Sequence, residues 1–263
     1  MIFDPFGDFS ARGYLRNFAG EKDSEIVKRL EHSSFSTGID EAFSFLGGKD
    51  RITYDDFLDV HRILFEAIYP WAGQDRLTTA AELAISRGDV LFARPHDMRR
   101  SVDFGLDLAR DPADMAKKPG EIMGYFAYGH PFLDGNGRTI MVVHTELAQR
   151  AGISIDWGAT DKAQYLTFLT RELAEPGKGH LDGYLGPFVG RAVGHEQLAS
   201  HVSRTSGLDS STPSIDQNKV LGSVEDTALA ARYEQQELRQ EVARSESQKE
   251  RGRSDGDRGG RER

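Results

Sequence analysis

The sequence predicts an all-helical domain with one small β-hairpin, followed by a polar and largely disordered tail. Three observations lead to this prediction. Apolar residues recur at helical spacing through most of residues 21–200, and short strand-like runs appear only between Gly73 and Pro95. From about Ser203 the composition shifts to Ser, Thr, Gly and Asp. We therefore divide the chain into an N-terminal arm (1–20), a helical domain (21–200) and a linker with a charged tail (201–263).

The helices are expected wherever apolar residues form one stripe and a cap or stop signal bounds it. Thr53 and Asp56 have the spacing of an N-terminal cap, Pro119 suits the first turn of a helix, and Gly152 suits the end of one. The expected helices are Glu21–His32, Ile39–Leu46, Thr53–Ile68, Met98–Ala109, Pro119–Tyr128, Thr139–Ala151, a helix capped by Thr160-Asp161 that runs through Leu173, and Leu181–Val193. A charged helix over Glu225–Arg244 is also possible, and disorder is expected over Ser245–Arg263.

The predicted hairpin consists of two short runs around a turn. Leu77-Thr78-Thr79 and Asp89–Phe92 have strand character, and Ser86-Arg87-Gly88 supplies the turn.

Composition limits the classes of function. The chain has 263 residues, no cysteine and a formal net charge of −9, so neither a disulfide framework nor a thiolate site exists and a general nucleic-acid binder is disfavoured. It has no apolar run long enough for a bilayer and no basic-then-apolar leader at Met1. We expect a cytoplasmic protein without a membrane partner and without direct contact to nucleic acid.

One stretch, Gly129–Thr139, concentrates the chemistry of the chain. His130 can take up a proton near neutral pH, Asp134 offers an oxygen ligand for Mg2+, and Arg138 offers a forked cation for phosphate. The glycines of Gly135-Asn136-Gly137 let the backbone approach an anion where an apolar helix begins, and such a helix end binds phosphate. The stretch therefore indicates nucleotide chemistry, although Asp-Gly and Asn-Gly are also ordinary turn dipeptides. Two other histidines, His61 and His144, lie on predicted helices, where a structural role is expected.

This stretch resembles the signature of the Fic (Fic/Doc, or Fido) family, His-x-Phe-x-Asp/Glu-Gly-Asn-Gly-Arg-x-x-Arg. The last arginine of that signature is replaced by Met141. Tyr69–Gly73 and Phe92–Pro95 resemble the segments that enter and leave the family's substrate-docking hairpin, or flap. The resemblance extends from about Tyr14 to Gly190. The signature positions that match are His130, Phe132, Asp134, Gly135, Asn136, Gly137 and Arg138.

The resemblance implies a helical bundle with a flap and an enzyme that transfers AMP from ATP to a Tyr, Ser or Thr hydroxyl of a target protein. It implies His130 as the base, Asp134 as the Mg2+ ligand and ATP as the co-substrate. The nucleotide would be held by Gly135, Asn136, Gly137 and Arg138, with Arg87 and Gly88 at the flap tip. Two alternatives stay open: a phosphotransferase or other nucleotidyl transferase of the same fold, and a non-catalytic nucleotide-binding module.

The resemblance to bacterial Fic toxins also implies partners. A type II topoisomerase subunit is the first candidate target, and delivery into another cell is possible. Thr37–Glu41 has the spacing of the family's inhibitory motif but continues with Ala42, and Met141 cannot pair with an inhibitory glutamate. We therefore expect inhibition by a separate small antitoxin protein, or altered inhibition.

Overall fold

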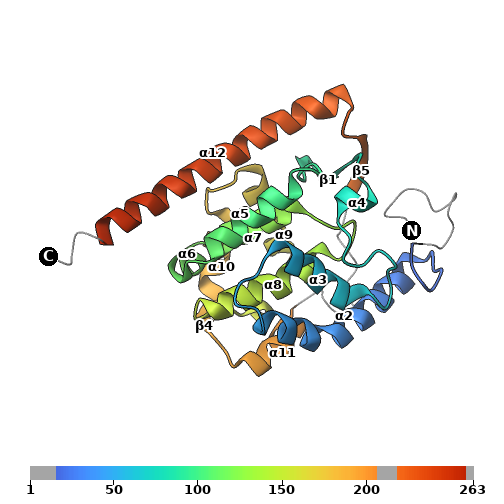
Figure 1. Ribbon diagram of the computed structural model, residues 1–263, viewed down its shortest axis with the longest axis horizontal. Helices are drawn as coiled ribbons and strands as arrows, with labels where there is room; N and C mark the ends of the chain where they lie inside the picture. Colours follow the sequence, from blue (N-terminus) through green and yellow to red (C-terminus); the bar gives the residue numbers. More distant parts are fainter. Residues whose placement is uncertain (1–15, 206–217, 259–263) are drawn as a thin grey trace.

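Helix α7 (Pro119–Gly129) lies at the centre of the fold, and every one of its residues is buried. Helices α5, α8, α9 and α10 pack against it (Figure 1). The computed structural model describes residues 16–205 and 218–258, and among these no helix is both long and apolar enough to span a membrane. The helices are α2 (Ser24–Gly47), α3 (Tyr54–Phe65), α4 (Arg76–Thr79), α5 (Met98–Ala109), α6 (Pro112–Lys117), α7, α8 (Asn136–Arg150), α9 (Lys162–Ala174), α10 (His180–Leu185), α11 (Leu198–Ser203) and α12 (Thr227–Arg258), with 3-10 turns at Trp157–Ala159, Gly186–Phe188 and His195–Gln197.

Two small antiparallel sheets accompany the helices. The first has the strand order β2-β1-β5, in which a strand from the C-terminal part of the chain joins the hairpin formed by β1 and β2. The second pairs β3 with β4 beside the C-terminal end of α8. The strands are β1 (Leu83–Arg87), β2 (Val90–Leu91), β3 (Ile153–Ile155), β4 (Val189–Arg191) and β5 (Asn218–Ser223).

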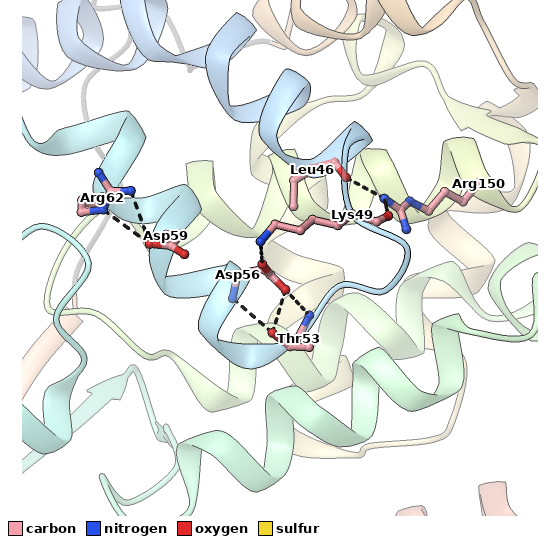
Figure 2. Close-up of polar contacts among 7 residues, drawn as sticks. All are labelled: Leu46, Lys49, Thr53, Asp56, Asp59, Arg62 and Arg150. Carbon is pink, nitrogen blue, oxygen red and sulfur yellow. Dashed lines mark hydrogen bonds and ion pairs between the residues drawn. The ribbon is translucent and has the colours of Figure 1, made fainter.

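The turn between α2 and α3 is fixed by charged side chains (Figure 2). The Asp56 carboxylate accepts hydrogen bonds from the Thr53 amide (2.9 Å) and hydroxyl (2.7 Å), which forms the predicted capping box. Lys49 Nζ lies 2.7 Å from the same carboxylate. Arg150, at the end of α8, donates to the carbonyls of Leu46 (2.7 Å) and Lys49 (2.8 Å). The helix that begins at the motif is thereby tied to α2 and α3 at its far end.

Several predicted elements are confirmed and others are corrected. The helices over Met98–Ala109 and after the Thr53 cap are present, but the two helices expected between Glu21 and Leu46 are one continuous helix, α2. Leu77-Thr78-Thr79 is not a strand, because Asp75 caps a short helix there. The helix expected over Leu181–Val193 ends at Leu185, where Gly186 and Pro187 follow.

The prediction of a largely disordered tail is wrong for the described residues. Helix α12 runs to Arg258 along one side of the domain (Figure 1), and β5 precedes it. Tyr128 Oη donates to Glu237 at 2.7 Å, and Lys118 Nζ lies 2.7 Å from Glu250. The linker predicted up to Gln217 and most of the predicted N-terminal arm lie outside the described residues.

The charged helix considered over Glu225–Arg244 is present as part of α12, and apolar spacing marks it only weakly because its buried face carries polar as well as apolar residues. Leu229 and Tyr233 are buried, but Gln240, Arg244 and Ser247 continue the same face at helical spacing. Ser247 donates to Glu121 on α7, and Arg244 lies 3.7 Å from Glu237 on α12 itself.

Replacing Glu237 by Ala should lower the free energy of unfolding. The buried Tyr128 hydroxyl would lose its acceptor, which costs about 1–3 kcal/mol. Glu234→Ala, at an exposed position of the same helix, serves as the control and should change stability little. Chemical denaturation of both variants measures the difference, and equal stabilities would show that α12 is not docked through Glu237.

Candidate active site

The sharp turn after α7 places His130. Its φ of 43° puts it in the left-handed region, where it is alone among the non-glycine residues that the structure describes. The buried guanidinium of Arg76 holds this turn: Nε donates to the His130 carbonyl (2.8 Å) and one terminal nitrogen donates to the Ala93 carbonyl (2.7 Å). The Arg76 amide donates to the Pro131 carbonyl at 2.7 Å. No residue before Arg76 in the sequence indicates that its side chain holds the turn at His130, so this role was not predicted.

The imidazole of His130 is buried and its protonation is defined by its neighbours. Asn136 accepts the Phe132 amide proton through Oδ1 (2.9 Å) and donates to the Phe132 carbonyl through Nδ2 (2.5 Å), which fixes the orientation of its amide group. The same Nδ2 lies 3.2 Å from His130 Nε2, so Nε2 is an acceptor and carries no proton. The ring of Phe92 stacks on the imidazole with centroids 3.8 Å apart.

The electrostatic surroundings keep this histidine neutral. Burial lowers the pKa of His130 well below its ordinary value, and the positive charges of Arg76 and Arg87 lower it further. Charge on the imidazole would cost solvation that the protein does not replace. At neutral pH the unprotonated Nε2 is therefore available to accept a proton.

The glycine turn leads directly into α8. Gly135 has φ 75° and precedes the helix, and a Cβ there would come within 2.6 Å of the Phe65 ring, so both conformation and space require glycine. A Cβ on the exposed Gly137 would meet nothing within 4 Å, so the first turn of α8 is open on that side. A helix beginning leaves N–H groups without intrahelical partners, and α8 is long enough, at 15 residues, to carry a helix dipole.

A second histidine holds the same turn. Nδ1 of His61 accepts the Gly73 amide proton (2.9 Å), so Nε2 is the protonated nitrogen and donates to the Asp134 carbonyl (3.1 Å). The ring stacks on Phe132 with centroids 3.7 Å apart. Burial lowers the pKa of His61 to about 3, with a further contribution from Arg138. The structural role predicted for His61 is confirmed, as it is for His144, which lies 2.7 Å from the Pro119 carbonyl.

Arg138 is oriented by a buried acid that the sequence analysis did not select. Its Nη2 forms an ion pair with Glu31 on α2 at 2.8 Å, and Tyr69 donates to the same carboxylate at 2.6 Å. The guanidinium lies 4.7 Å from the Phe65 ring centroid. Burial lowers the pKa of Arg138, but Glu31 and then Asp134 outweigh it and raise the pKa overall. The sequence does mark Glu31 as unusual, because it interrupts the buried apolar stripe of Val27, Phe35 and Ile39 on α2.

Asp134 is the one acidic side chain of the motif itself. It is half-buried, and its Oδ1 accepts the Gly135 amide proton at 2.7 Å. Within the described residues no group of three or more histidine and acidic side chains could hold a metal ion. A single carboxylate suits Mg2+ when phosphate oxygens and water supply the remaining ligands, so the site fits a metal that arrives with a nucleotide.

The predicted flap residues lie close to the base. Arg87 ends β1 and its charge acts on His130, and Gly88 forms the turn with φ 56°. Met141 lies elsewhere: it is buried in the core, with the Thr205 hydroxyl 3.5 Å from its sulfur. The structure thus gathers His130, Asp134, Asn136 and Arg138 around one turn, and the charge of Arg87 acts on His130.

Residues 51–148 of the chain match the Fic/DOC family. Among curated proteins, the chain is similar to protein adenylyltransferase VbhT of Bartonella schoenbuchensis, at 28% identity over 188 residues. This match covers 68% of the chain but only 37% of VbhT. A second relative, probable protein adenylyltransferase y4lH of Sinorhizobium fredii, is 26% identical over 61% of the chain and 83% of its own length.

Solved structures show the same fold. BepC, a VirB-translocated effector of Bartonella tribocorum crystallised with AMPPNP, superposes with a TM-score of 0.53 at 15% identity, over 68% of this chain and 93% of BepC. The N-terminal Fic domain of an effector from Bartonella quintana, crystallised with ADP, gives a TM-score of 0.52 at 17% identity, over 68% of this chain and 92% of its own. The matched family segment contains the whole motif and the turn that holds it. Residues 51–148 are therefore similar to the Fic/DOC family, and the chain has the fold of the two Bartonella domains.

Proposed function

We propose that the protein is an adenylyltransferase that moves AMP from ATP to a hydroxyl group of a target protein. One observation carries the proposal: the unprotonated Nε2 of His130 contacts Asn136, the first residue of α8. The side chain of Asn136 therefore links a proton acceptor to the N-terminus of a helix. Such a helix end binds phosphate. The adenylyltransferase names of VbhT and y4lH and the nucleotides in the two Bartonella structures agree with it.

The proposed reaction is a single in-line displacement. His130 Nε2 accepts the proton of the target hydroxyl while the oxygen forms a bond to the α-phosphorus of ATP. The bond between the α-phosphorus and the bridging oxygen breaks, and pyrophosphate leaves with that oxygen. The amides of the first turn of α8 and the guanidinium of Arg138 stabilise the negative charge of the phosphates. Mg2+, when bound with ATP, would be held by Asp134 and would neutralise phosphate charge.

The roles of the motif residues divide into two kinds. The hydrogen bonds that the Asn136 side chain makes with described residues all lie within the turn, so we assign its contribution to the nucleotide to its backbone amide. Gly135 gives the turn its shape, and Gly137 leaves the approach to the helix open. Arg87 and Gly88 would border the nucleotide from the flap. These binding roles are proposals that rest on position and chemistry.

The proposal extends to partners. A type II topoisomerase subunit remains the first candidate target, and a separate antitoxin remains the expected inhibitor, because the buried Met141 offers no cation to an inhibitory glutamate. BepC, which has a similar fold, is a VirB-translocated effector, so we propose that the protein acts either in the cell that makes it or in a recipient cell.

His130→Ala should reduce protein labelling by about 100- to 10,000-fold, the contribution of a positioned base. The assay uses Mg2+, bacterial lysate and ATP labelled at either the α- or the γ-phosphate. Labelling from the α-phosphate alone is expected for wild type and for the control His96→Ala, whose side chain is exposed. Labelling from the γ-phosphate alone would indicate a phosphotransferase, and nucleotide binding without labelling would favour the binding module.

Activity should persist to lower pH than for an unperturbed histidine. Since the pKa of His130 lies well below 6.5, the base form is present at neutral pH, and kcat/KM should fall only at pH values well below 6.5. Arg87→Gln removes a positive charge near the imidazole, so the pKa should rise and the acid limb should move to higher pH. Arg191→Gln, on the exposed strand β4, is the control. Superimposable profiles for all three proteins would contradict the placement of Arg87.

Arg138→Ala should weaken the binding of ATP but not of AMP, because the proposed contact is to the departing phosphates. Loss of a hydrogen bond to a charged group costs about 1.5–3 kcal/mol, which corresponds to roughly 10- to 150-fold in affinity. Calorimetric titration with ATP and with AMP measures both constants. An equal loss for the two nucleotides would place Arg138 away from the β- and γ-phosphates.

A further inference from the structure

The outer edge of strand β1 is occupied by the chain's own C-terminal segment. Strand β5 pairs antiparallel with β1 from Leu83 opposite Ser223 to Arg87 opposite Asn218, with an irregularity between Ala84 and Ile85. Strand β2 occupies the other edge of β1. A strand more than 130 residues away in sequence therefore completes the sheet beside the active site (Figure 1).

A row of residues connects this edge to the proposed base. Val220 on β5 lies opposite Ile85 on β1, and the Ile85 carbonyl accepts the Phe92 amide proton at 3.0 Å. The Phe92 ring in turn stacks on His130. Because neighbouring strands lie about 4.8 Å apart, β5 is two strand spacings from the segment that touches the imidazole. An extended polypeptide on this edge is therefore presented close to His130.

Two apolar side chains of β5 contribute little packing to hold it in place. The side chains of Val220 and Leu221 are 47% and 37% exposed, although both are apolar. The segment that follows is anchored separately: Leu229 and Tyr233 on α12 are buried against Ala84 and Leu91 of the hairpin. Strand β5 could thus leave the edge of β1 while the start of α12 stays docked.

We propose that β5 is an internal occupant of the surface on which the target protein docks. An extended segment of the target displaces β5 and pairs with β1 through the main chain, as exposed sheet edges do with added strands. This inference rests on the proposed function, because it assigns the regulation of that same site. If the edge of β1 is free of β5 for about a tenth of the time, the apparent affinity for the target is roughly tenfold lower than it would be with the edge always free.

The test is the double variant Val220→Pro/Leu221→Pro. Proline donates no backbone hydrogen bond, and N–H directions alternate along a strand, so two successive prolines remove a bond to β1. The control Leu238→Ser/Val242→Ser changes two exposed apolar side chains of α12 instead. Thermal unfolding of each variant establishes that the domain is folded.

The first readout does not depend on catalysis. A fluorescent synthetic peptide with the sequence of residues 217–224 should bind the proline variant, and equally its His130→Ala form, about tenfold more tightly than it binds wild type or the α12 control. Binding is followed by fluorescence anisotropy. Absence of peptide binding to a folded proline variant would overturn the proposal and identify β5 as a permanent strand of the sheet.

The second readout is protein labelling from ATP labelled at the α-phosphate. The proline variant should label the acceptor proteins of a bacterial lysate about tenfold faster than wild type, with unchanged affinity for ATP, and excess peptide should suppress the increase. Unchanged or slower labelling with intact ATP binding would contradict competition at the edge. If the peptide binds but neither protein transfers label, the proposed function fails and the displaceable edge stands.

Discussion

The active site depends on the buried guanidinium of Arg76. Burial of a charged group costs several kcal/mol unless hydrogen bonds replace the lost water, and here burial lowers the pKa of Arg76 to about 10. The carbonyls of His130 and Ala93 accept hydrogen bonds from this guanidinium. The cost of burying the charge is thus offset by contacts that define the turn. The same contacts hold His130 in a left-handed conformation, which costs a non-glycine residue about 1–3 kcal/mol. The proposed base is thus oriented by the fold before any ligand binds.

The same principle places the groups around the base. The neutral side chain of His61 links Gly73 to Asp134. One ring nitrogen accepts a hydrogen bond from the Gly73 amide, and the other donates one to the Asp134 carbonyl. Glu31 fixes the guanidinium of Arg138 through a buried ion pair. Removing one partner of such an ion pair leaves an uncompensated buried charge. The pair therefore defines the position of the Arg138 guanidinium strictly. Polar groups from α2, α3 and the flap therefore converge on one turn, which is rigid where phosphate and hydroxyl would meet.

The sequence predicted the features that local rules govern. The Thr53 capping box, the helix at Pro119 and the motif turn all follow from residue type and spacing. Arg76 and Glu31 could not be assigned in the same way, because their roles come from partners that the fold brings from distant segments. The extension of α12 beyond Arg244 was missed for a related reason: its buried face carries polar residues such as Ser247, which bonds to Glu121 on α7, so no apolar stripe marks it. The pairing of β5 with β1 likewise depends on contacts distant in sequence.

The central claim is that the phosphates of ATP lie over the first turn of α8, with the α-phosphorus nearest to His130. A crystal structure with Mg2+ and a non-hydrolysable ATP analogue tests it most directly. The account predicts the α-phosphate beside His130 Nε2, the β- and γ-phosphates beside Arg138, and a metal ion between the phosphates and Asp134. A nucleotide bound in the reverse direction, with its γ-phosphate nearest to His130, or bound away from α8, would contradict it.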